Sequence, residues 1–189
     1  MDFIRLLQKN EILRRYIVMN SFDGALTILG IVIAMMVANV SSVRLVLISA
    51  IGVIFATGVS GVWGGYLAEK AERKHQLTEL KKLHPNEDLS KRRKKFKKLT
   101  IIMGLANGLS SSIVGVITIA PFFFAGFGLI SVNTAYLTSI MLVGFALVII
   151  GSFTARIARE NIAKHAFMMV LAGIIVGLVI YLFELLKFG

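Results

Sequence analysis

Asp23 is the residue whose position most strongly suggests chemistry. It lies in the segment FDGALTILG, inside an apolar stretch that predicts a helix over residues 17–41. A carboxylate within a bilayer costs about 2.5–3.5 kcal/mol, so such residues usually face a wet cavity or another subunit. Asn20 and Thr27 lie near it at helical spacing and offer further oxygen atoms. We therefore expect Asp23 to be functional, with Asn20 and Thr27 either adding oxygen ligands or hydrogen-bonding internally; the alternative is that Asp23 is shallow enough to reach headgroup water.

A second group of polar residues follows the second apolar stretch. Helical spacing places Glu69, Glu72, Gln76 and Glu79 on one face, with His75 adjacent to it. Carboxylates and an imidazole suit a hard or borderline divalent cation, so these residues predict a cytosolic metal site. The alternative is a solvated helix with Glu69–Arg73 and Glu79–Lys82 ion pairs.

The composition shows what must position these residues. The chain has 189 residues, of which 57% are hydrophobic and 16% charged, and its mean hydropathy is +0.81. Residues 24–43, 45–68, 100–155 and 166–183 contain no charged residue. Each run approaches or exceeds the roughly 20 residues that cross a bilayer as a helix. Continuous apolar runs without period-two alternation argue against an outer-membrane barrel.

The third run is long enough for two crossings. Pro121, Gly126, Gly128 and the polar residues 131–134 supply a break within it. We therefore predict an all-α integral membrane protein with five transmembrane helices. Their approximate limits are 17–41, 44–68, 100–124, 132–155 and 163–186.

The region between the second and third helices predicts a cytosolic helical hairpin. Residues 45–82 contain no strong helix breaker, and a helix of that length spans about 57 Å whereas the hydrocarbon core is about 30 Å thick. It should end near KLHPNEDLS, where Asp88 or Ser90 can cap a second short helix through KRRKKFKKL. The predicted parts are an interfacial amphipathic helix at 1–16, transmembrane helices over 17–68, the insert at 69–99 and transmembrane helices over 100–189.

The distribution of positive charge predicts the topology. Of 21 Lys and Arg residues, only Arg44 and Lys187 lie on the side opposite the basic connections. By the positive-inside rule the N-terminus is cytoplasmic and the C-terminus lies on the other side of the membrane. The basic run is predicted to bind anionic lipid headgroups rather than nucleic acid, since Phe96 is its only aromatic residue. The residues expected to do so are Lys91, Arg92, Arg93, Lys94 and Lys95.

Several activities are disfavoured. The chain has no cysteine, so disulfides, thiolate metal sites and cysteine nucleophiles are excluded. It contains no HExxH, GxSxG or glycine-rich phosphate loop, and no second acidic residue lies deep in the membrane to pair with Asp23. We therefore expect a protein that is not an enzyme and has no permanent cofactor. A small-solute exporter fits less well, because no second charged group is available to recognise a zwitterion.

Three segments resemble the vacuolar iron transporter family. FDGALTILG is similar to that family's Asp-Gly motif in helix 1, and GGYLAEKAERKH is similar to its signature at the end of helix 2. GLSSSIVGVITIAPFF is similar to its helix 3. The likeness covers almost the whole chain from about Tyr16, including the five-helix layout.

The resemblance implies a homodimer that exchanges Fe²⁺ or Mn²⁺ for protons and removes the metal from the cytosol. It places Asp23 at the family's pathway aspartate and Glu72 in its cytosolic metal site. On this resemblance we predict a metal pathway formed by Asp23, Asn20 and Thr27. Registered on GGYLA, the family's helix 2 acid falls at Val53 and its pathway methionine at Gly61. We expect a metal transporter in a prokaryotic plasma membrane; the alternative is a non-transporting protein of the same fold whose hairpin binds anionic lipid or a protein partner.

Overall fold

The computed structural model describes residues 11–85 and 88–186, and within these ranges the chain is helical without strands. All five helices of the described residues are long and apolar enough to cross a membrane. They are α2 (Glu11–Val37), α3 (Val43–Leu83), α4 (Ser90–Gly126), α5 (Val132–Ala158) and α6 (Ile162–Leu185). The predicted helical membrane fold is confirmed at this level. Of the predicted interfacial segment, residues 1–10 lie outside the described residues and 11–16 form the first turns of α2.

Helix α3 is unbroken through the transition from apolar to charged sequence. Its 41 residues correspond to a length of about 62 Å at 1.5 Å per residue. Ser42 caps its N-terminus, with the side chain accepting a hydrogen bond from the Leu45 amide. The helix ends at Leu83, two residues before Pro85, because the residue preceding a proline is disfavoured in helical conformation.

Helix α4 is also one continuous helix, so the short helix predicted for the basic run is its first part rather than a separate element. Leu89 is the N-cap residue and makes no side-chain capping bond. Asp88 instead accepts hydrogen bonds from the Ser90 amide and hydroxyl, both at 2.9 Å. Pro121 lies inside the helix without ending it. The turn comes after Gly126, and Gly128 adopts a φ of 73°.

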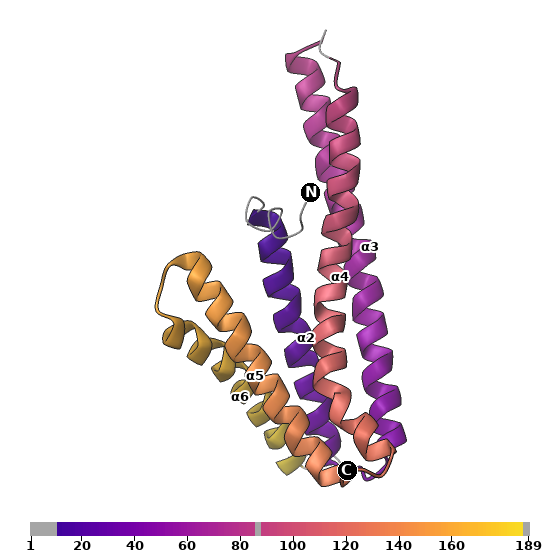
Figure 1. The fold of residues 1–189 in the computed structure, drawn as a ribbon, viewed down its shortest axis with the longest axis vertical. Coiled ribbons are helices and arrows are strands. Elements are labelled where there is room, and N and C mark those ends of the chain that lie inside the picture. The colour runs from indigo at the N-terminus through magenta and orange to yellow at the C-terminus, as the bar shows by residue number, and fades with distance from the viewer. Residues whose placement is uncertain (1–10, 86–87, 187–189) are drawn as a thin grey trace.

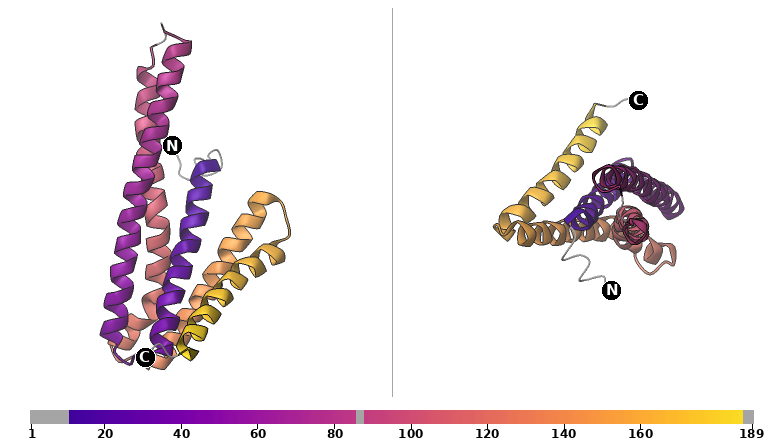
Figure 2. Two further views of the ribbon diagram at one scale, coloured as in Figure 1. Left: turned by 180° about the vertical axis from the view of Figure 1, so that it is seen from behind. Right: turned by 90° about the horizontal axis from the view of Figure 1, so that it is seen from above.

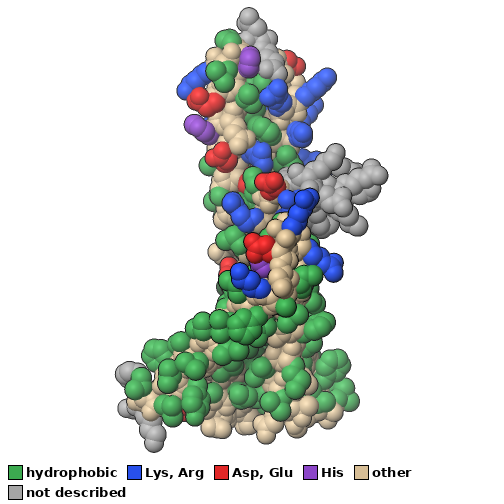
Figure 3. Space-filling model, turned by 90° about the vertical axis from the view of Figure 1, so that its left-hand side faces the viewer, with side chains coloured by type: hydrophobic (Ala, Val, Ile, Leu, Met, Phe, Trp, Pro, Cys, Tyr) green, Lys and Arg blue, Asp and Glu red, His purple; other side chains and the backbone are tan. Residues whose placement is uncertain are grey.

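Helices α3 and α4 lie side by side and extend together well beyond the other three (Figure 1). Hydrophobic side chains cover the lower part of the molecule, whereas Lys and Arg gather on the projecting pair, here called the hairpin (residues 69–99; Figure 3). Glycines permit this close packing. A Cβ atom on Gly61 would lie 2.7 Å from Gly108 Cα, so the two backbones are in direct contact.

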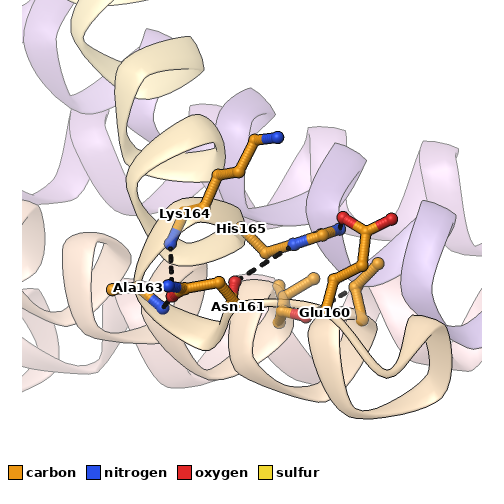
Figure 4. A network of polar contacts seen from close by, with 7 residues as sticks. Glu160, Asn161, Ala163, Lys164 and His165 are labelled. Atoms are coloured by element: carbon orange, nitrogen blue, oxygen red, sulfur yellow. Dashed lines mark hydrogen bonds and ion pairs between the residues drawn. The ribbon is translucent and has the colours of Figure 1, made fainter.

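Helices α5 and α6 form a second antiparallel pair, which diverges from α3 and α4 (Figure 2). Arg159 turns the chain with a left-handed φ of 57°. The Asn161 side chain then caps α6 by accepting from the Ala163 and Lys164 amides (Figure 4). His165 Nε2 lies 3.8 Å from Glu160 Oε2 in the same turn. His165 therefore belongs to a local turn network.

The principal core joins α2, α3, α4 and α5 near the end opposite the hairpin. Ile28, Val32, Ile119 and Phe122 are buried there, and the Phe122 ring meets that of Tyr136 edge-on at 4.9 Å between centroids. Many large apolar side chains are exposed on the outside of the helices. In the most apolar 18-residue stretch of α6, only 6% of the residues are buried. Such a surface requires an apolar solvent, which supports an integral membrane protein.

Candidate functional site

A polar groove of about 560 Å³ opens between α2 and α3, with α4 at its floor. Its lining contains one carboxylate, two amides, four hydroxyls and otherwise only glycine and alanine. The polar lining residues are Asn20, Asp23, Thr27, Thr57, Ser60, Asn107 and Ser111. All three predicted pathway residues therefore lie in one groove, within helices of membrane length.

Asp23 has no hydrogen bond or ion pair with any other described residue. The next residue, Gly24, explains how it reaches the groove. A Cβ on Gly24 would lie 2.5 Å from the Ser111 carbonyl oxygen, so a glycine is needed for α2 to approach α4 this closely. Asp23 is exposed in the single chain, which leaves its carboxylate free for a proton, a cation or a second subunit.

Asn20 and Asn107 form a hydrogen-bonded relay that fixes the orientation of both amides. The Gly61 carbonyl can only accept, so Asn107 directs its NH₂ group there, with Nδ2 at 2.7 Å from the oxygen. Asn107 Oδ1 then accepts from Asn20 Nδ2, which also donates to the Tyr16 carbonyl at 2.8 Å. Asn20 Oδ1 is left without a hydrogen bond among the described residues. Asn20 and Asp23 both line the groove.

The sequence analysis missed Asn107, Thr57 and Ser60 as groove residues. Thr57 and Ser60 lie on the face of α3 turned toward α2, and a face cannot be assigned before the neighbouring helix is known. Asn107 had a usable signal, since it is an amide side chain within the uncharged run 100–155. Buried amides in a membrane require hydrogen-bond partners, so the residue type and its position indicate a polar site near Asn107.

The donor atoms define the chemistry that the groove can perform. Its lining contains carboxylate, amide and hydroxyl groups but no thioether, thiol or imidazole. Oxygen donors suit hard and borderline divalent cations. The resemblance expects a methionine at position 61. This chain has Gly61 there, and its backbone packs directly against Gly108. Sulfur ligation is therefore absent from this groove.

Glu69, the first residue of the predicted cytosolic metal site, faces inward rather than toward solvent. It is only 5% exposed, its Oε1 accepts from the Tyr16 hydroxyl at 3.2 Å, and its Oε2 lies 3.3 Å from Arg73 Nη2. Arg73 in turn lies over the Phe96 ring, 5.1 Å from the centroid. Glu69 therefore connects α3 to α2 within one chain, and Arg73 connects it to α4.

The other predicted ligands of this site are dispersed along α3. Glu72 accepts from Gln76 Nε2 at 3.0 Å, and Glu79 pairs with Lys82 at 2.8 Å. His75 is exposed. Across residues 11–85 and 88–186, no three His, Cys, Asp or Glu side chains come together as a metal-binding group. Both ion pairs of the alternative interpretation are present.

The predicted lipid-binding residues lie on the first turns of α4 and are all exposed. They are Lys91, Arg92, Arg93, Lys94 and Lys95. They start at the tip of the hairpin, so the positive charge continues from the tip toward the membrane-length part of α4 (Figure 3). Arg93 and Lys94 also line a separate groove at the tip.

The fold and the polar groove define a class: a polytopic helical membrane protein with an isolated carboxylate in a cavity between membrane-length helices. The model of the VIT family matches residues 14–101 and 84–184. The chain therefore belongs to the VIT family, and the suspected family is confirmed.

One relative supports the same assignment. An uncharacterized protein of Methanocaldococcus jannaschii, MJ0645, is 32% identical over 174 residues, which cover 90% of this chain and 87% of that protein. Its name assigns no activity. No solved structure matches the chain.

Proposed function

We propose that this protein transports a divalent metal cation, Fe²⁺ or Mn²⁺, through the groove around Asp23 and removes it from the cytosol in exchange for protons. The observation that carries the proposal is the Asp23 carboxylate, which has no partner among the described residues and lies in a polar groove between membrane-length helices. Family membership supports metal transport as the general activity. The oxygen-rich lining is compatible with both metals, because Mn²⁺ and Fe²⁺ accept carboxylate and carbonyl ligands.

Coupling to protons follows from the same carboxylate. A carboxylate binds either a proton or a cation, and a bound cation favours its ionised form. A proton and a cation therefore compete for Asp23, and release of one accompanies binding of the other. Asn20 Oδ1 and the hydroxyls of Thr27 and Thr57 supply neutral oxygen ligands in this scheme.

A homodimer is part of the proposal. One carboxylate with neutral oxygens binds a divalent cation weakly, and an exposed carboxylate at membrane depth is costly. A second copy placed against the open side of the groove would cover Asp23 and bring a second carboxylate. The proposed location is a prokaryotic plasma membrane, which the prokaryotic relative supports. The proposed orientation has a cytoplasmic N-terminus, which the charge distribution supports.

The test is Fe²⁺ and Mn²⁺ uptake into proteoliposomes that contain a pH-sensitive dye, with wild type compared with Asp23→Asn. We expect metal entry with opposite proton movement in wild type and loss of both in Asp23→Asn. Asp88→Asn is the matched control, since it removes a carboxylate outside the groove. Metal flux retained in Asp23→Asn would refute the pathway.

A second function has one observation in its favour. The hairpin carries 12 Lys and Arg residues against five Asp and Glu residues, and such a surface attracts anions rather than cations. On this alternative the protein does not transport, and Lys91, Arg92, Arg93, Lys94 and Lys95 hold anionic lipid headgroups or an acidic partner. Absence of flux under any metal or pH gradient would favour it.

A further inference from the structure

The tip of the hairpin contains a second groove, of about 740 Å³, between α3 and α4. Five of its lining side chains are cationic, one is a carboxylate and two carry hydroxyls; the remainder are leucines. The charged and hydroxyl residues are Lys74, Thr78, Lys81, Lys82, Asp88, Ser90, Arg93 and Lys94. The cations come from both helices, so they converge on a shared space.

Most of these cations have no acidic partner. Lys82 pairs with Glu79 at the surface. Among the described residues, the side chains of Lys74, Lys81, Arg93 and Lys94 make no ion pair. Neighbouring like charges repel each other, and a multivalent anion between them would relieve that repulsion.

Asp88, the one acidic residue among the described lining residues of the groove, already accepts hydrogen bonds within the protein. Its two carboxylate oxygens accept hydrogen bonds from the Ser90 amide and hydroxyl. Both bonds lower the pKa of Asp88, and the bond from the amide has the larger effect. It stays ionised at neutral pH and offsets one positive charge. The groove therefore keeps an excess of cations beside the N-terminus of α4, where the helix dipole also favours an anion.

If the hydrocarbon core ends where the uncharged run ends, the groove lies beyond the lipid headgroups. It begins about 9 Å and ends about 21 Å past Ala68, the end of the uncharged run, at 1.5 Å per residue, whereas the headgroup layer on one side is about 5–8 Å thick. Figure 1 shows that the hairpin continues along the long axis of the molecule instead of folding back. A soluble ligand can reach this position more readily than a lipid of the same membrane.

We propose that the tip groove binds a soluble anion that carries two or more phosphate groups. Arg93 provides a planar, bidentate donor for one phosphate, and the three lysines on α3 with Lys94 provide point charges for the others. Leu77 and Leu89 form an apolar part of the lining that can contact an uncharged portion of the ligand. The site is separate from the Asp23 groove and does not depend on transport.

The test uses the full-length protein in nanodiscs of zwitterionic phosphatidylcholine, titrated with inorganic pyrophosphate in a calorimeter. We expect saturable binding that weakens with salt. The variant Lys81→Gln/Arg93→Gln/Lys94→Gln should lose about tenfold or more in affinity, because it removes three charge-assisted contacts. The matched control Lys91→Gln/Lys95→Gln/Lys97→Gln removes the same charge from exposed positions outside the groove and should change affinity by less than about threefold.

Equal losses of pyrophosphate affinity in the two triple variants would refute the proposed site, since only the total charge of the hairpin would then matter. Failure of wild type to bind pyrophosphate would overturn it as well. A second arm adds phosphatidylglycerol vesicles to the same nanodiscs. Capture of these vesicles through Lys81, Arg93 and Lys94, without pyrophosphate binding, would refute a soluble ligand. The groove would then bind the phosphates of a membrane surface.

Discussion

In the membrane groove, one carboxylate lies among neutral oxygen atoms without a partner, whereas every described carboxylate on the hairpin already has one. Glu69 contacts Arg73 and Tyr16, Glu79 pairs with Lys82, and Asp88 is held by Ser90. The groove thus has an unused negative charge and the hairpin has unused positive charges. This difference motivates our two proposals, a cation site in the groove and an anion site on the hairpin.

The two regions have different charge but share one structural element. The long α3 places both regions on one element, because 41 residues exceed what a bilayer requires. A rigid helical extension does not need to carry metal ligands. In this chain the charged residues of the extension are predominantly lysine and arginine, and a shared fold does not by itself determine what the extension binds.

The largest effect on stability is expected at Glu69. In Glu69→Ala, Arg73 would remain with only 15% of its side chain exposed and without its carboxylate, and breaking a buried pair in this way costs about 3–5 kcal/mol. The measurement is the free energy of unfolding in mixed micelles. Glu72→Ala, on an exposed side chain, should change it by no more than about 0.5 kcal/mol.

A double variant sharpens the interpretation of Glu69. Glu69→Leu/Arg73→Leu removes both charges and should recover much of the lost stability, since replacing a buried ion pair by apolar residues is often neutral. If Glu69→Ala left stability unchanged but removed metal binding, Glu69 would be a ligand and the contrast between the two regions would fail.

The next effect concerns Asn107, which orients Asn20. Asn107→Ala should weaken Mn²⁺ binding by about 10–100-fold, the usual consequence of losing a residue that positions a ligand. The matched control is Ser112→Ala: Ser112 also bonds from α4 to an α3 carbonyl, that of Ile54 at 3.3 Å, but does not line the groove. Equal affinity losses in both variants would show that only helix packing matters.

A smaller effect is expected where α3 and α4 touch. Gly61→Ala forces a Cβ against the Gly108 backbone and should lower the unfolding free energy by about 1–3 kcal/mol. Gly64→Ala on the same helix meets no atom within 4 Å and should have little effect. Gly61→Met should likewise destabilise, without improving metal binding. A stable Gly61→Met protein with tighter Mn²⁺ binding would contradict our explanation of this position.

The sequence was sufficient for the helical membrane fold. Uncharged runs and the breaker at Pro85 predicted five helices and an unbroken α3, and the observed helices extend some predicted limits by several residues. Asp88 and Ser90 were correctly associated with the start of α4, although Leu89 is the cap residue. Pro121 lies inside α4, and the helix continues for five residues after it.

The candidate site was predicted only in part, for geometric reasons. Asp23, Asn20 and Thr27 share one helix face, so spacing alone brought them together. Asn107 and Thr57 reach the groove from other helices, and their positions depend on how α2, α3 and α4 pack. Spacing also placed Glu69 with Glu72 and Glu79 but could not show that Tyr16 of α2 covers it.

Mn²⁺ binding followed by electron paramagnetic resonance, in nanodiscs of the full-length protein, tests the central claim most directly. Wild type, Asp23→Asn and the hairpin variant Glu72→Gln/Glu79→Gln would be compared. We predict that Asp23→Asn abolishes the bound signal and that the hairpin variant binds as wild type does. Binding that survives Asp23→Asn but is lost in Glu72→Gln/Glu79→Gln would place the cation site on the hairpin and contradict the account.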